Sequence, residues 1–247
     1  MKNSENAAIP ASAIAMLPGR HCRPSGKEAH ARRNPSSNCS STRILQVHHF
    51  PGQNGVTMLV PTVRTADTQP HLFVYYTADG YNKTGCYNHD CTAFVQYSTT
   101  VTPGNNLAPV SHTSSAQYEI QLQAKLTGGN WWIFYAGKPM GYYPTSLYHG
   151  GQLTKHATLV DYGTETTGTT FWPPAGGGAW SSAGWEKAAY VRELYYISSS
   201  TATSGTWETL TRQQPNPNCY SVTGPYYSST AGWGVYFYDG GPGGGNC

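Results

Sequence analysis

Short apolar runs alternate with turn residues over most of this chain. The runs are about 5–8 residues long, and clusters rich in Gly, Pro and Asn separate them. Residues 117–125 alternate strictly, with Tyr118, Ile120 and Leu122 on one face and glutamate or glutamine side chains on the other. This period of two is typical of an antiparallel strand with one buried face.

The clearest runs predict strands at residues 43–47, 56–60, 71–76, 93–97, 116–122, 131–135, 156–162, 188–197 and 235–238. Residues 188–194 would also fit a helix, but their Tyr and Val content favours a strand. Many short strands with no helical segments between them indicate a sandwich or a barrel. We expect an all-β fold, an antiparallel β-sandwich of two packed, curved sheets, because this arrangement covers the apolar face of each sheet.

Composition excludes several other classes of protein. Only 11% of the 247 residues are charged and 13% are aromatic, with 19 Tyr and 7 Trp. A disordered chain has fewer aromatic and more charged residues, and a coiled coil needs far more Glu and Lys. No stretch approaches the roughly 18 apolar residues of a membrane-spanning helix, so we expect no membrane partner.

The positive charge is concentrated at the N-terminus. Residues 1–45 carry a net charge of +5, and the remaining residues carry −2. The first segment is polar and lacks periodicity, so we expect 1–45 to be a disordered or propeptide-like tail and 46–247 to form one domain. Its weakly apolar stretch is interrupted by Pro10 and is not a clear signal peptide. The alternative that the true start of the protein lies further upstream stays open. The scattered basic residues of the domain do not predict a nucleic-acid partner.

Cysteine spacing indicates the compartment. Cys86 and Cys91 are five positions apart, which suits a short disulfide loop better than a zinc site. A bond between Cys219 and Cys247 would hold the C-terminus in place. Disulfides persist in oxidising compartments, so we expect an extracellular protein.

Several motifs, taken in order, resemble one known family. They are LFVYYTADGY at 72–81, GCYN and CTAFVQ within 85–96, NWW at 130–132, GYYP at 141–144, VDYGTE at 160–165, KAAY at 187–190, CY at 219–220 and WGVYFYDGGPG at 233–243. Together they resemble the neprosin family, glutamic endopeptidases first known as a plant domain of unknown function. The resemblance covers residues 53–247. It implies a β-sandwich, the disulfides Cys86–Cys91 and Cys219–Cys247, and an acid-acting peptidase with a polypeptide substrate and two catalytic glutamates. Cleavage at proline, known in the plant member, is a further expectation.

The second family glutamate corresponds to Glu165, within the Gly163-Thr164-Glu165 motif. At the first glutamate's position this chain has Gln53, when Gly55 is aligned with the motif glycine. A carboxylate can deprotonate water and an amide can donate to an oxyanion, so a Gln/Glu pair suffices chemically. The fungal glutamic peptidases are similar in using that pair. We therefore expect Glu165 to be the general base and Gln53 the oxyanion donor. Glu119 is an alternative second carboxylate.

Four aromatic residues are candidate substrate contacts: Trp131, Trp132, Tyr143 and Tyr162. Adjacent strand residues face opposite ways, so one of the two tryptophans is expected in the core. His48-His49 is the only close histidine pair, and we expect no metal or other cofactor and a monomeric protein. Two alternatives stay open. One is a non-catalytic sandwich that binds peptide or carbohydrate, and the other is an inactive family member that lacks the first catalytic glutamate.

Overall fold

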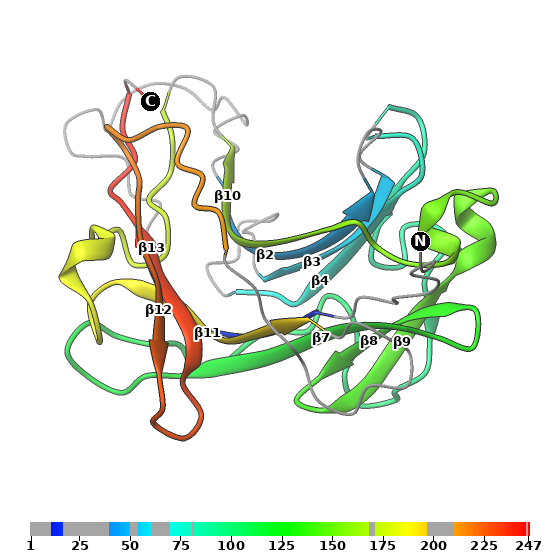
Figure 1. Ribbon diagram of the computed structural model, residues 1–247, viewed down its shortest axis with the longest axis horizontal. Helices are drawn as coiled ribbons and strands as arrows, with labels where there is room; N and C mark the ends of the chain where they lie inside the picture. The colour runs from blue at the N-terminus through cyan, green and yellow to red at the C-terminus, as the bar shows by residue number, and fades with distance from the viewer. Residues whose placement is uncertain are drawn as a thin grey trace, which may run out of the picture.

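The computed structural model describes residues 11–16, 40–49, 54–60, 70–80, 82–167, 171–196, 210–245 and 247. Two antiparallel sheets face each other, as Figure 1 shows, and the predicted all-β sandwich is confirmed. Helical structure in the described residues is confined to the short 3-10 turns η1 (Thr145–Tyr148), η2 (Gln152–Thr154) and η3 (Ser181–Ala183).

The larger sheet contains β1 (Ala11–Met16), β6 (Val95–Gln96), β7 (Glu119–Thr127), β8 (Asn130–Tyr135), β9 (Lys138–Pro144), β11 (Ala189–Tyr196), β12 (Ser221–Ser228) and β13 (Gly234–Gly240). Their spatial order is β12-β13-β11-β1-β7-β8-β9-β6. The tight turn Gly128-Gly129 joins β7 to β8. Glycine suits both positions, because both adopt positive φ values that other residues rarely tolerate.

The smaller sheet contains β2 (Ser40–His49), β3 (Asn54–Val60), β4 (Phe73–Thr77), β5 (Cys86–Tyr87) and β10 (Leu159–Thr167), in the order β10-β2-β3-β4-β5. All neighbouring strands pair antiparallel. The edge strand β10 pairs with β2 over its full length, from Leu159 opposite His48 to Thr167 opposite Ser40.

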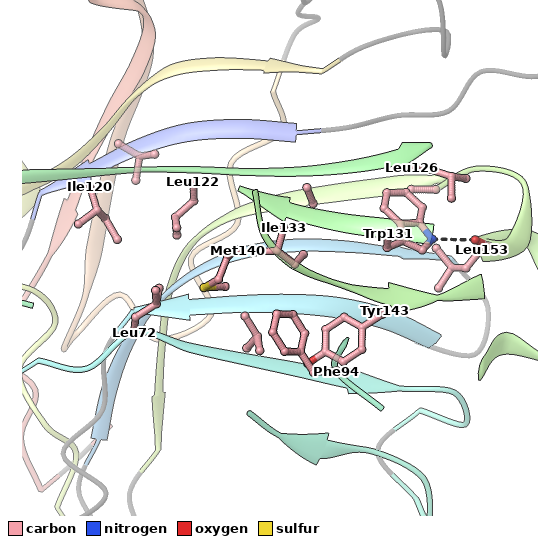
Figure 2. Packing of buried hydrophobic residues seen from close by; sticks show 14 of the residues in the cluster. Leu72, Phe94, Ile120, Leu122, Leu126, Trp131, Ile133, Met140, Tyr143 and Leu153 are labelled. Carbon is pink, nitrogen blue, oxygen red and sulfur yellow. Dashed lines mark hydrogen bonds between the residues drawn. The ribbon is translucent and has the colours of Figure 1, made fainter. Parts of the chain in front are cut away.

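The core lies between the facing sheets. Alternation along β7 buries Ile120 and Leu122, as the sequence predicts, and leaves the glutamate and glutamines on the outer face. Tyr118, predicted on the same face as Ile120, precedes the strand and is 37% exposed. Figure 2 shows these leucine and isoleucine side chains packed with Trp131 and Tyr143, which are fully buried. Burying side chains of this size contributes about 1.5–3 kcal/mol each.

Two strands lie partly or wholly within the segment expected to be a tail. β1 pairs with β7 on one side and with β11 on the other, and β2 begins at Ser40. The segment 11–16 is ASAIAM, which has no charge and a single polar residue, so it suits a strand between two others even though residues 1–45 as a whole are polar. Pro10 just precedes β1, where a missing amide does not interrupt the ladder.

Both predicted disulfides are present. Cys86 is bonded to Cys91 and Cys219 to Cys247, and the described residues contain no free cysteine. The first bond closes the loop after β5, and the second attaches the last residue to the segment that precedes β12. No helix among the described residues is long and apolar enough to cross a membrane.

Candidate active site on the five-stranded sheet

Glu165 lies on the edge strand β10, opposite Thr42 of β2. The neighbouring residues on the other face of β10 point toward the larger sheet. Tyr162 donates its hydroxyl hydrogen to the carbonyl of Tyr195 at 2.9 Å, and Thr164 donates to Asp239 Oδ2 at 2.5 Å. Because strand side chains alternate, Glu165 points away from the core, and its side chain is exposed.

The Glu165 carboxylate has no hydrogen bond or ion pair with any residue that the structure describes. Although its side chain is exposed, the surrounding chain displaces enough water to raise the pKa of Glu165 above the ordinary glutamate value. A carboxylate with these properties can accept a proton from a bound water molecule, because no cation or donor among the described residues stabilises its charged form.

An aromatic patch lies on the same outer face of the smaller sheet. Its members are Phe73, Tyr75 and Tyr87, and the ring centroid of Tyr87 lies 5.3 Å from that of Phe73 and 4.6 Å from that of Tyr75. Phe73 is only 9% exposed, so Tyr75 and Tyr87 form the accessible part of the patch. Val74 and Tyr76, which alternate with them on β4, pack against the core. Three strand intervals separate β4 from β10, so the patch lies about 14 Å from the Glu165 strand.

Strand register bears on the partner predicted for Glu165. Gln53 itself lies outside the described residues. Its neighbour Asn54 pairs with His49, which is seven positions along β2 from Thr42, the residue opposite Glu165. At about 3.3 Å per residue these positions are about 23 Å apart along the strand. The pairing of β2 with β3 therefore gives no support to a direct Gln53–Glu165 dyad.

Glu119, the alternative second carboxylate, lies in the other sheet and is paired with a cation. Arg192 donates from Nε to Oε1 at 2.7 Å and from Nη2 to Oε2 at 2.6 Å, and Tyr190 donates to Oε1 at 2.6 Å. Burial by itself raises the pKa of Glu119, but these hydrogen bonds and the guanidinium charge outweigh it and lower the pKa. Glu119 is therefore a poor base and not a partner for Glu165.

Three of the four aromatic side chains predicted to contact substrate are packing residues instead. Trp131 and Tyr143 are fully buried, and the Trp131 indole donates to the carbonyl of Leu153 at 2.7 Å (Figure 2). Tyr162 reaches across to the larger sheet. Only Trp132 faces outward, and it contacts Tyr142 with ring centroids 4.7 Å apart on the larger sheet.

The aromatic patch on β4 and β5 is not among the site residues predicted from the sequence. Alternation within residues 72–76 separates Phe73 and Tyr75 from Val74 and Tyr76. The sequence does not tell which of these two faces is covered by the second sheet. The pairing of β4 with β5, which brings Tyr87 opposite Tyr75, cannot be obtained from local pattern alone.

Comparison with protein families agrees with the fold and the motifs. The family model named Neprosin matches residues 55–242, which include Glu165 and begin two positions after Gln53. The match spans most of the chain and includes strands of both sheets, although β1 and β2 precede it. The chain therefore belongs to the neprosin family.

Proposed function

We propose that this chain is an extracellular glutamic-type endopeptidase that acts at acid pH, with Glu165 as its general base. The observation that carries the proposal is the placement of Glu165 on an open sheet face. Its side chain is exposed and has no hydrogen bond or ion pair with a described residue, and its pKa is raised. Membership of the neprosin family supports it independently. The two disulfides fit an oxidising compartment.

In this reaction the Glu165 carboxylate takes a proton from water, and the resulting hydroxide adds to the scissile carbonyl carbon. The tetrahedral intermediate then collapses and the C–N bond breaks, while Glu165 returns the proton to the leaving amine. The carbonyl oxygen needs a hydrogen-bond donor during the addition. The family pattern suggests Gln53 for this role, whereas the register of β2 and β3 favours a donor nearer to Thr42.

An extended peptide crossing the smaller sheet from β10 would reach Tyr75 and Tyr87, the accessible part of the aromatic patch. Aromatic faces offer apolar contact to a proline ring or to another apolar side chain. Cleavage near proline is therefore part of the proposal, with the patch as the group that binds the proline several residues from the scissile bond.

Replacing Glu165 tests the proposal directly. The purified chain is incubated with a denatured proline-rich protein at pH 3 to 7, and the fragments are mapped by mass spectrometry. Glu165→Gln should abolish cleavage, whereas Glu193→Gln, in the other sheet, should leave it unchanged. Because burial raises the pKa of Glu165, kcat/KM should fall on the acid side at a higher pH than an ordinary glutamate would give.

A second substitution separates the possible donors. Gln53→Ala should reduce kcat by about 10²–10³ if this amide stabilises the oxyanion, and by much less than tenfold if the donor lies elsewhere. Full activity of Glu165→Gln would refute the assigned base. Absence of cleavage by the unaltered protein at every pH would refute the peptidase proposal.

One observation favours a second candidate function, a sandwich that binds peptide without cutting it. No described side chain makes a hydrogen bond to Glu165, so the described residues provide no partner to complete a two-residue centre. In that case the unaltered protein would bind the proline-rich substrate through the aromatic patch and leave it intact.

A further inference from the structure

A cavity of about 490 Å³ lies on the outer face of the larger sheet, away from Glu165. Its floor comes from β7 and β11, and its walls come from the turn before β7, the segment after η3 and the turn between β12 and β13. Figure 1 shows the hairpin of β12 and β13, whose turn forms one of these walls, at one end of the sandwich. Its volume falls within the range of small-ligand sites.

The floor of the cavity is a fixed polar network. The bidentate pair between Arg192 and Glu119 is half-buried, and Tyr190 donates to the same carboxylate. Neither Nη1 of Arg192 nor any other remaining donor of this guanidinium has a partner among the described residues. A Cβ built on Gly232 would lie 3.2 Å from Nη1, so the glycine leaves that nitrogen accessible from the turn.

Two tryptophans form the walls. Trp185 is 44% exposed, and its ring centroid lies 5.2 Å from that of Trp233 and 5.0 Å from that of Tyr190. The Arg192 guanidinium carbon lies 5.8 Å from the centre of the Trp233 ring. Such contacts fix the orientation of the indoles, so that the exposed part of Trp185 is a rigid apolar surface.

The charges of the cavity argue against an anionic ligand. Its lining has two carboxylates, Glu119 and Glu186, and one cation, Arg192, which already pairs with Glu119. A phosphate or carboxylate would meet net negative charge. The other polar side chains of the lining are uncharged. The Oε1 atom of Gln117 is buried and has no hydrogen-bond donor among the described residues, and a ligand hydroxyl could donate to it.

The position of the cavity also argues against an extended peptide. Peptides that bind β-proteins commonly pair with an unoccupied sheet edge. Here β7 lies between β1 and β8, and β11 lies between β13 and β1, so the backbone groups of the floor already serve the sheet. The floor therefore offers a ligand side chains and no free backbone groups, which suits a compact ring that presents hydroxyls at its rim and C–H groups on its face.

We propose that this cavity binds a carbohydrate, with one sugar ring stacked on Trp185 and its hydroxyls bound by Arg192 Nη1 and Glu119 Oε2. The site is separate from the proposed active site, because Glu165 lies on the outer face of the opposite sheet. Sugar binding would hold the protein at a polysaccharide or glycan surface while the Glu165 face stays accessible.

Soluble oligosaccharides test the proposal. The purified chain is titrated with the hexasaccharides of β-1,4-linked glucose and β-1,4-linked N-acetylglucosamine, and binding is followed by calorimetry and tryptophan fluorescence. At least one sugar should bind saturably. Trp185→Ala should weaken it at least about tenfold, and Trp185→Phe, which keeps an aromatic face, should weaken it less. Tyr97→Ala, an exposed aromatic beside β6 at the far end of the sheet, should bind as the unaltered protein does.

Circular dichroism of each variant checks that the fold is retained. Absence of binding to both sugars would overturn the proposal, as would equal affinities of Trp185→Ala and the unaltered protein. A lysine-rich peptide that binds at Trp185 in place of sugar would also overturn it. The result does not depend on Glu165, since Glu165→Gln should bind sugar normally even if the peptidase proposal fails.

Discussion

At the scale of single residues, buried tyrosine hydroxyls differ in their contribution to the stability of the fold. Tyr143 and Tyr148 are buried and their hydroxyl groups have no partner among the described residues, whereas the Tyr162 hydroxyl donates to Tyr195. Burial raises the pKa of Tyr143 well above its usual value, so the group stays neutral at every pH of interest. A buried hydroxyl without a partner lowers stability, and a bonded one raises it.

Tyrosine-to-phenylalanine variants should therefore act in opposite directions. Tyr143→Phe should leave the free energy of unfolding unchanged or raise it by up to about 1 kcal/mol, because the ring packing is kept and an unpaired group is removed. Tyr162→Phe should lower it by about 1 kcal/mol through loss of the hydrogen bond to Tyr195. Urea denaturation measures both. A loss of stability in Tyr143→Phe would show that its hydroxyl has a partner.

Residue identity alone located some of the candidate site. Glu165 could be selected because a motif of known spacing surrounds it, and the structure places it on an exposed strand face. Trp131 and Tyr143 could not be assigned correctly, because alternation along a strand separates two faces without telling which one a second sheet covers. The Glu119–Arg192 pair joins residues more than 70 positions apart and leaves no local pattern.

At the scale of elements, the turn after β4 is organised by one carboxylate. Asp79 accepts hydrogen bonds from the backbone amides of Asn82, Lys83 and Thr84. Partial desolvation by itself raises the pKa of Asp79, but the hydrogen bonds from the Thr84 hydroxyl and these amides outweigh it and lower the pKa to about 2. The ionised form therefore stabilises the folded turn.

Asp79→Asn should lower the melting temperature at pH 7, because the amide side chain is a weaker acceptor. An unfolded aspartate has a pKa near 3.9, so the contribution of Asp79 is complete above about pH 4 and is lost as the pH falls toward 2. The melting temperatures of the unaltered protein and the variant should converge over that interval. A constant difference from pH 7 to pH 2 would contradict this account.

The strands with clear alternation were predictable, and those interrupted by Gly or Pro were not. β9 contains Gly141, where a Cβ would meet Phe94 and the carbonyl of Val95, so close packing of a neighbouring segment requires the glycine. β12 contains Gly224-Pro225 at a shift in its register with β13. Both look like turns in the sequence, and only tertiary packing makes them strands.

At the scale of the whole molecule, β10 links the two sheets. It pairs with β2 through its backbone, while Tyr162 and Thr164 reach strands β11 and β13 of the larger sheet. Asp239, which accepts from Thr164, is 3% exposed. A hydrogen bond to a buried carboxylate contributes more than one between neutral groups.

Thr164→Val keeps the shape of the side chain and removes this link. It should lower the free energy of unfolding by about 1.5–3 kcal/mol, because Asp239 stays buried with one donor fewer. Thr113→Val, in an exposed turn, should change it by less than about 0.5 kcal/mol. Equal effects of the two substitutions in chemical denaturation would show that the sheets are held together without this contact.

The position of β1 has a consequence for the order in which the chain can fold. This strand is synthesised before all others described, yet its neighbours β7 and β11 begin more than 100 and more than 170 residues later. Its pairing with β7 can begin first, but its pairing with β11 must wait until β11 has left the ribosome, and contacts so distant along the chain form slowly. Until then the larger sheet is incomplete, so the completion of this sheet is the step at which a chaperone would protect the most exposed apolar surface.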